Sequence, residues 1–90
     1  MAEAAALSVT TGGTAQSVFA ANPQRRVLIF TNTSDEVQYV RFGATAADGV
    51  GVCCPASGGG FVLEGLSCPK GAISMIGATT GKKFYAYEGV

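Results

Sequence analysis

Short β-favouring runs separated by turns occupy almost the whole sequence after Ala15. Examples are AQSVFA at 15–20, RVLIFTN at 26–32 and FVLEGL at 61–66, and residues such as Gly, Pro, Asn and Ser lie between the runs. Strand-length runs with turns roughly every eight to twelve residues are typical of β-sandwiches and barrels. The sequence therefore predicts an all-β fold, a small single-domain β-sandwich or barrel, jelly-roll-like, with about six to seven short antiparallel strands.

The run at 26–32 and the run that follows it predict a hairpin. Residues Val27 to Phe30 are all apolar, which indicates a central strand buried on both faces. VQYVRF at 37–42 alternates two sets of side chains, as a half-buried strand does. Because only the turn TSDE separates the two runs, we expect them to pair with each other.

The C-terminal part of the chain predicts a second hairpin. AISMIG and KKFYAYEG flank the short connection ATTG, in which Gly81 suits a turn with positive φ. Strand alternation places Tyr85 and Tyr87 on one face of the last strand. Phe84 and Ala86 belong to the opposite face. No helix longer than a turn or two is expected.

Two parts of the chain depart from the strand pattern. Residues 1–14 are predicted to form an N-terminal arm, mobile or docked on a neighbouring molecule, because AEAAAL is too short to hold a helix alone and TTGG interrupts regular structure. Residues 43–60 are loop-rich, with VGVCC as the one strand candidate. A chain of 90 residues has room for one core, so residues 15–90 are predicted to be a single β-domain.

The composition points to a protein that shares its surface with other proteins. Charged residues are only 13% of the chain and hydrophobic residues 48%, against a usual charged share of about 25%. A chain this small hides only about 60–65% of its unfolded surface by folding alone.

The basic residues are too few for a nucleic-acid-binding surface, which needs several phosphate contacts on one face. The only basic pairs are Arg25–Arg26 and Lys82–Lys83. No membrane segment is expected, because the apolar runs are too short.

The residue types that catalysis needs are scarce. There is no histidine, which removes the commonest general base, the usual catalytic triads and a frequent metal ligand. Glu64 and Glu88 could approach each other across strands as a glycosidase pair, but their spacing gives this no support. GGTAQS and ATTGKK do not match phosphate-binding loops. We expect no enzyme activity, no catalytic residue, no metal and no cofactor.

The cysteines Cys53, Cys54 and Cys68 leave several interpretations open. A zinc site needs four ligands and a wider spacing than an adjacent pair offers, and a catalytic thiol needs a base. A disulfide from Cys53 or Cys54 to Cys68 stays open, since both segments precede turns. Small, buried, apolar side chains are the favoured interpretation. The redox state of the three thiols is not determined by the sequence.

A few residues are candidates for contact with a partner. Tyr39, Tyr85 and Tyr87 could form an aromatic platform for a sugar or a protein, although strand tyrosines are more often half-buried packing residues. The arm contributes apolar side chains that could reach a neighbour. The candidate protein-interface residues are Leu7, Val9, Tyr39, Arg41, Tyr85 and Tyr87.

Two stretches, ANPQRRVLIFTNTSDEVQYVRFG at 21–43 and CPKGAISMIGATTGKKFYAYEG at 68–89, carry a resemblance. The chain resembles small virion proteins from the structural gene block of tailed bacteriophages, which show N-P-x-R-x-x-L-x-x-x-N-x-S, then an aromatic–Gly pair, and close on G-A-x-S-x-x-G-x-x-T-G-x-x-F-x-x-x-E-G. The paired cysteines have no counterpart in that pattern. The matching positions are Asn22, Pro23, Arg25, Leu28, Asn32, Ser34, Phe42, Gly43, Gly71, Ala72, Ser74, Gly77, Thr80, Gly81, Phe84, Glu88 and Gly89.

The resemblance implies a small β-domain on the phage particle. The commonest such role is a capsid decoration, or cement, protein that binds the assembled shell as a homotrimer and stabilises it, with the major capsid protein or other virion proteins as partners. Such a protein is made in the host cytoplasm and is located on the virion. The N-terminal stretch MAEAAALSV agrees with synthesis in the cytoplasm, because it lacks the basic start of a signal peptide. Alternatives are a neck, tail or fibre component, or a host-glycan-binding adhesion module.

Overall fold

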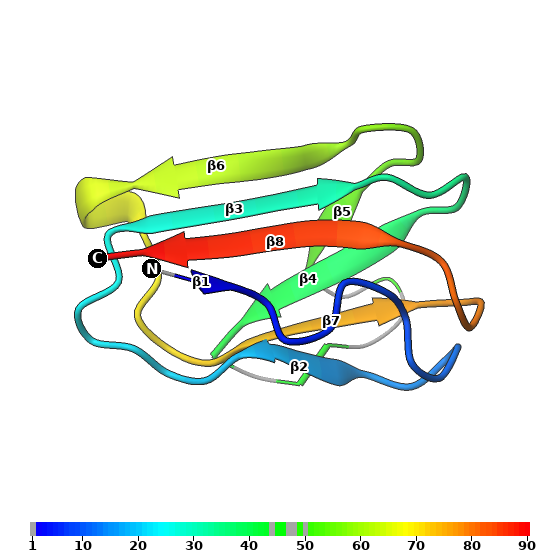
Figure 1. The fold of residues 1–90 in the computed structure, drawn as a ribbon, viewed down its shortest axis with the longest axis horizontal. Helices are drawn as coiled ribbons and strands as arrows, with labels where there is room; N and C mark the ends of the chain where they lie inside the picture. The colour runs from blue at the N-terminus through cyan, green and yellow to red at the C-terminus, as the bar shows by residue number, and fades with distance from the viewer. Residues whose placement is uncertain (1, 44, 47–48, 50) are drawn as a thin grey trace.

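A computed structural model describes residues 2–43, 45–46, 49 and 51–90. The chain forms two antiparallel sheets of four strands, packed face to face (Figure 1). The first sheet has the order β1-β8-β3-β6 and the second β2-β7-β4-β5. A single turn of 3₁₀ helix, η1 (Gly65–Ser67), follows β6. The strands are β1 (Ala2–Glu3), β2 (Gln16–Phe19), β3 (Val27–Asn32), β4 (Gln38–Phe42), β5 (Val52–Cys54), β6 (Gly60–Glu64), β7 (Ile73–Gly77) and β8 (Phe84–Gly89).

The strand pairing is that of a jelly roll. β1 pairs with β8, β2 with β7, β3 with β6 and β4 with β5, as in a long antiparallel ribbon. The ribbon is wound so that β8 also pairs with β3 and β7 also pairs with β4. Consecutive strands therefore alternate between the sheets, except at β4 and β5. The predicted all-β, jelly-roll-like single domain is confirmed, with the two-residue β1 as an addition to seven longer strands among the described residues.

Both predicted hairpins are wrong, although their strands exist. β3 pairs with β6 and β8, whereas β4 pairs with β5 and β7. β7 and β8 likewise lie in different sheets. Each of these strands has one face that is more apolar, and two successive strands can bury those faces against each other by crossing to opposite sheets. The short connections TSDE and ATTG thus span the sandwich rather than close a hairpin.

The crossing from β3 to β4 is fixed by a buried asparagine. Asn32 Nδ2 donates hydrogen bonds to the carbonyl oxygens of Glu36 and Cys54, at 2.6 and 2.9 Å. Its Oδ1 accepts hydrogen bonds from the backbone N–H and the hydroxyl of Ser34, at 2.9 and 2.7 Å. A buried polar side chain is tolerated when its groups are paired in this way. Asn32 therefore ties β3, the β3–β4 connection and β5 together.

The core lies between the sheets and is rich in phenylalanine. Phe30 stacks on Phe61 and on Phe84, and Phe42 meets the edge of Phe61. The prediction that β3 is buried on both faces is corrected, because Val27, Ile29 and Thr31 are only half-buried. The fully or nearly buried apolar side chains are Ala4, Val9, Val18, Phe19, Leu28, Phe30, Val40, Ala46, Cys54, Cys68, Ile73, Met75, Ile76, Phe84 and Ala86.

The segment that was expected to form an arm packs on its own domain. β1 adds to the edge of the first sheet, and Ala4 N donates a hydrogen bond to Ala86 O at 3.0 Å. Val9 is 1% exposed and is held by bonds to the β7–β8 turn, from its N–H to Lys82 O and from Gly81 N to its carbonyl. The apolar side chains of this N-terminal segment are more stable when they cover the core than when they lie in water. Residues 2–13 thus belong to the sandwich in this chain.

Candidate interaction surface

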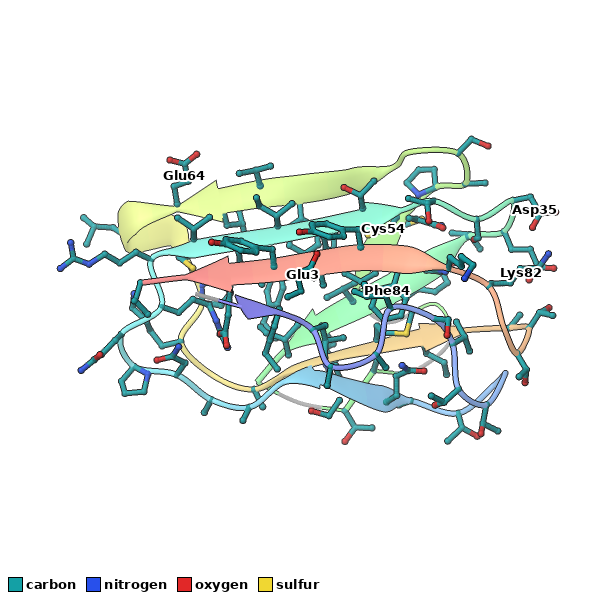
Figure 2. All side chains as sticks on the ribbon, in the orientation of Figure 1. Glu3, Asp35, Cys54, Glu64, Lys82 and Phe84 are labelled. Carbon is teal, nitrogen blue, oxygen red and sulfur yellow. The ribbon has the colours of Figure 1, made fainter. Side chains whose placement is uncertain are left out.

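The outer face of the first sheet is apolar and poor in charge. Four residues form one row across it in register, namely Glu3, Tyr87, Ile29 and Val62. The next row contains Tyr85 opposite Thr31. The alternate residues of the same strands point into the core. Within the described strands this face carries no Lys or Arg, and its acids lie at the edges, with Glu3 on β1 and Glu64 on β6 (Figure 2).

The two outward tyrosines of β8 lie beside a carboxylate. The Tyr85 side chain forms a hydrogen bond with Glu3, and this bond raises the pKa of Tyr85, with smaller contributions from burial and from the Glu3 charge. A phenol that donates to a carboxylate keeps its proton more firmly. The predicted split of β8 is confirmed, because Phe84 and Ala86 are buried and Tyr85 is exposed. β8 therefore presents an aromatic strip with an acid at its margin.

The other predicted interface residues lie elsewhere. Tyr39 and Arg41 are on the outer face of the second sheet, opposite Ile76 and Ser74 of β7. Leu7 and Val9 pack against the core, and Val9 is buried. The three tyrosines therefore do not form one platform, because Tyr39 and the β8 pair are on opposite sides of the sandwich. The alternation along each strand predicted which side chains share a face, but it did not predict which of the two sheets the strand joins.

The loop after β4 covers part of the second sheet. Ala46 is buried, and its N–H donates a hydrogen bond to Ser74 Oγ at 2.8 Å. Arg41 Nη1 bonds to the carbonyl of Thr45 at 3.2 Å. The outer face of the second sheet is thus partly occupied by the protein's own chain. The open face of the first sheet is the better candidate for a partner.

Sequence reasoning missed one feature of the surface, the exposed edge formed by β6. β6 lies at the outer edge of the first sheet and pairs with β3 along five residues without a shift of register. Its outward side chain Val62 is 58% exposed, and Leu66, in the turn of 3₁₀ helix after the strand, is fully exposed. The run FVLEGL predicted a strand, but a period-2 pattern cannot tell an edge strand from a central one.

A basic cleft continues from the end of β6. Arg26, Gly65, Leu66 and Lys70 line a hollow of about 300 Å³. A second hollow of about 530 Å³ shares Arg26 and Lys70 and adds Pro23, Gln24 and Val90. The Lys70 ammonium also donates to the Arg25 carbonyl oxygen. Two cations beside an exposed leucine suit an acidic and partly apolar ligand.

Arg25 fixes this end of the sandwich from inside. The side chain is 0% exposed, and Nε bonds to Glu88 at 2.8 Å. Its other nitrogens donate to the carbonyl oxygens of Ala20, Pro69 and Gly71, at 2.8, 2.8 and 2.9 Å. The guanidinium thereby joins the β2–β3 loop, the β6–β7 loop and β8. Of the adjacent pair Arg25–Arg26, only Arg26 faces the surface.

The thiols are free and differ in environment. The sequence favoured three small, buried, apolar cysteine side chains, and Cys54 and Cys68 are indeed buried. Cys53 is exposed, so the prediction is wrong for this residue. The structure shows no bond from Cys53 or Cys54 to Cys68. Burial, assisted by neighbouring Cys53, raises the pKa of Cys54 to about 11. The Cys54 thiol is therefore protonated and unreactive near neutral pH.

The acids do not assemble into a reactive site in the described part of the chain. Glu64 pairs in register with Val27 on the outer face, whereas Glu88 lies opposite Leu28 on the inner side and binds Arg25. The two carboxylates are thus on opposite faces of the sheet, which does not fit a glycosidase pair. Among the residues placed by the structure, no group of three His, Cys, Asp or Glu side chains is arranged to hold a metal.

Comparisons with known proteins found no match among protein families, curated proteins or solved structures. No helix in the described ranges is long and apolar enough to cross a membrane. The interpretation of the surface therefore depends on the residues themselves and on the fold.

Proposed function

We propose that this chain is a structural protein of a tailed-phage virion, of the capsid decoration or cement type. It binds the assembled shell as a homotrimer, with the major capsid protein or another virion protein as partner, and it needs no cofactor or catalytic group. It is made in the host cytoplasm and is located on the virion. The resemblance of residues 21–43 and 68–89 supports this role. Jelly rolls occur in viral capsid domains, which is support by analogy only, since one fold serves many functions.

The observation that carries the proposal is the outer face of the first sheet. Tyr85, Tyr87, Ile29 and Val62 lie together there, with acids only at the margins. Aromatic and aliphatic side chains with little charge are the composition of the centre of a protein interface. Cementing follows from mass action, because a subunit that binds only the assembled shell shifts the equilibrium toward that shell.

The proposal is tested with empty shells assembled from the major capsid protein encoded in the same genome. We expect the purified chain to co-sediment with the shells and to raise their rupture temperature. Tyr85→Lys places a charge on the first sheet's outer face and is expected to weaken binding by roughly tenfold or more. Tyr39→Lys is the matched control on the opposite sheet and should bind nearly as wild type. Shells that neither bind the chain nor gain stability would refute the cement role.

The position on the particle has its own test. Immunogold labelling of intact virions should place the chain on the capsid surface. Label confined to the neck, tail or fibres would instead assign it to one of those parts, which keeps the virion role and removes the cement role. The mass of the purified protein in solution tests the oligomeric state, and we expect three times the mass of one chain.

A second candidate is a glycan-binding adhesion module, favoured by the pairing of Tyr85 with Glu3. At such a site the aromatic ring can stack on a sugar, and the neighbouring carboxylate can accept a hydrogen bond from a sugar hydroxyl. Jelly rolls also include lectin domains. Binding on a glycan array that is lost in Tyr85→Ala, together with no binding to shells, would favour this candidate. Shell binding with no glycan bound favours the virion role.

A further inference from the structure

The four sheet edges of the sandwich differ in how far they are protected from a further strand. β1 is two residues long, β5 is three, and β2 has a register shift between Ser17 and Phe19. Short or irregular edges cannot support a regular ladder with another chain. β6 is different, because its five residues pair with β3 in continuous register. The β6 edge contains neither proline nor lysine.

Within the described part of the chain, no strand pairs with the outer side of β6. Asn32 N donates to Gly59 O at 2.7 Å, and Gly65 N donates to Arg26 O at 2.9 Å, so residues with odd numbers turn toward β3. In an antiparallel ladder, alternate residues direct their N–H and C=O to opposite sides. The N–H and C=O of Val62 therefore point away from β3. An extended peptide can bond to such a row.

We propose that β6 accepts an extended strand of the partner protein, which adds antiparallel to the first sheet as a fifth strand. This inference rests on the proposed function, where the partner is the shell protein. Every strand pairing among the described residues is antiparallel. The exposed Val62 side chain suits an apolar, β-branched residue beside it on the added strand. The ladder extends the row Tyr87–Ile29–Val62 onto the partner.

The basic cleft specifies the charge of that partner segment. A strand that runs antiparallel to β6 begins beside the end of β6, where Arg26, Leu66 and Lys70 form the cleft. The residues just before the added strand therefore lie over two cations. We assign the partner segment an acidic start followed by alternating apolar residues. Charge complementarity of this kind selects the partner and its direction.

A second copy of this chain fits the site less well. If two β6 strands paired antiparallel about Val62, residues 57–60 of the second copy would lie over the cleft. That segment is Ser-Gly-Gly-Gly and has no acid to place against Arg26 and Lys70. The charges of the cleft therefore favour a different protein as occupant. Self-association through β6 is an outcome that the test below detects.

The decisive variant is Val62→Pro. It removes the outward N–H of the edge and leaves the bonds of Phe61 and Leu63 to β3, since edge strands accept proline on the solvent side. Val62→Thr is the matched control, because it keeps the N–H and the side-chain shape. In shell co-sedimentation, Val62→Pro should bind about tenfold or more weakly and Val62→Thr within about threefold of wild type. Circular dichroism and amide NMR spectra verify that both variants fold.

A peptide probe tests the same site without shells. The probe is a synthetic peptide of two aspartates followed by alternating threonine and valine, and its control has two lysines in place of the aspartates. With isotope-labelled protein, the aspartate peptide should shift the amide signals of Val62 and Leu66, and Arg26→Glu should abolish its advantage over the lysine peptide. Signals that shift elsewhere, or equally with both peptides, contradict the assignment.

The outcomes separate this inference from the proposed function. If wild-type protein binds shells and Val62→Pro binds equally well, the β6 inference is wrong and the cement role stands. If wild-type protein does not bind shells but the aspartate peptide binds at β6 as expected, the cement role fails and the docking site stands. If sedimentation shows a self-association that Val62→Pro abolishes, the occupant is a second copy and the proposed partner is wrong.

Discussion

Arg25 Nε and Glu88 Oε1 meet at 2.8 Å inside the end of the sandwich. Arg25 comes from the β2–β3 loop and Glu88 from the last strand, so the pair joins segments that are far apart in sequence. Asn22 reinforces the contact with a 3.5 Å bond from Nδ2 to Glu88 Oε1. The guanidinium also lies over the Phe19 ring, at 5.7 Å from its centroid. Residues of the N-P-x-R and E-G motifs that carry the resemblance, Asn22, Arg25 and Glu88, are thus in contact with one another in the structure.

Arg25→Ala is expected to lower the free energy of unfolding by about 3–5 kcal/mol, because it leaves Glu88 half-buried without its partner and removes donors from three carbonyls. Arg26→Ala is the control at the adjacent, exposed position and should change stability by about 0.5 kcal/mol or less. Urea unfolding followed by circular dichroism measures both. Equal losses in the two variants would contradict the role given to Arg25.

Asn32→Ala is expected to destabilise the fold by about 1–3 kcal/mol, since the carbonyls of Glu36 and Cys54 lose their donor in a buried place. Thr33→Ala, at the next and exposed position, serves as the control with a loss of about 0.5 kcal/mol or less. Chemical denaturation gives the two values. A stability loss for Asn32→Ala that matches the control would show that the crossing is held by other contacts.

Ellman's reagent at pH 8 is expected to modify one thiol of the native protein, Cys53, because it alone of the three is exposed. In denaturant all three thiols should react. Cys53→Ser should remove the native reaction and leave two thiols reactive after unfolding. Rapid reaction of Cys54 in the native state would contradict its burial and its raised pKa.

The raised pKa of Cys54 predicts a loss of stability in alkali. The folded-state pKa is about 11, above the ordinary value of 9.0, so the folded state holds the thiol proton more tightly than the unfolded state. This stabilisation is fully present below pH 9 and is lost as the pH rises from about 9 to about 11. Denaturation of wild type and Cys54→Ala across this range is the measurement. A decline of the same steepness in both proteins would exclude Cys54 as its cause.

Gly81 has φ of +87°, as the sequence predicted for the turn before the last strand. A side chain at this position would have open space, so the cost of substitution is conformational. Gly81→Val is expected to lower stability by about 1 kcal/mol or more, and Gly81→Asn by less, because asparagine tolerates this conformation better. Thermal melts rank the variants. Equal melting temperatures for the three proteins would show that the turn relaxes.

The candidate surface was predictable only in part. Tyr85 and Tyr87 were assigned to the same face of the last strand because alternation is intrinsic to a strand. Tyr39 follows the same rule, yet it faces away on the other sheet. Val62 and Leu66 gave no signal, because exposure at an edge depends on which strands have neighbours. The sequence showed Arg25 only as half of a basic pair, and its burial depends on the loops that close around it.

By itself, the sequence determined the seven longer strands, the turns between them and the positive φ at Gly81, because each depends on a few adjacent residues. It also determined the scarcity of charge. Only the tertiary structure decided that β3 and β4, and likewise β7 and β8, cross to opposite sheets. The physical reason is that strand pairing is chosen by how all the apolar faces are covered at once, and no local pattern contains that information. The open edge of β6 and the buried Arg25 follow from the same global choice.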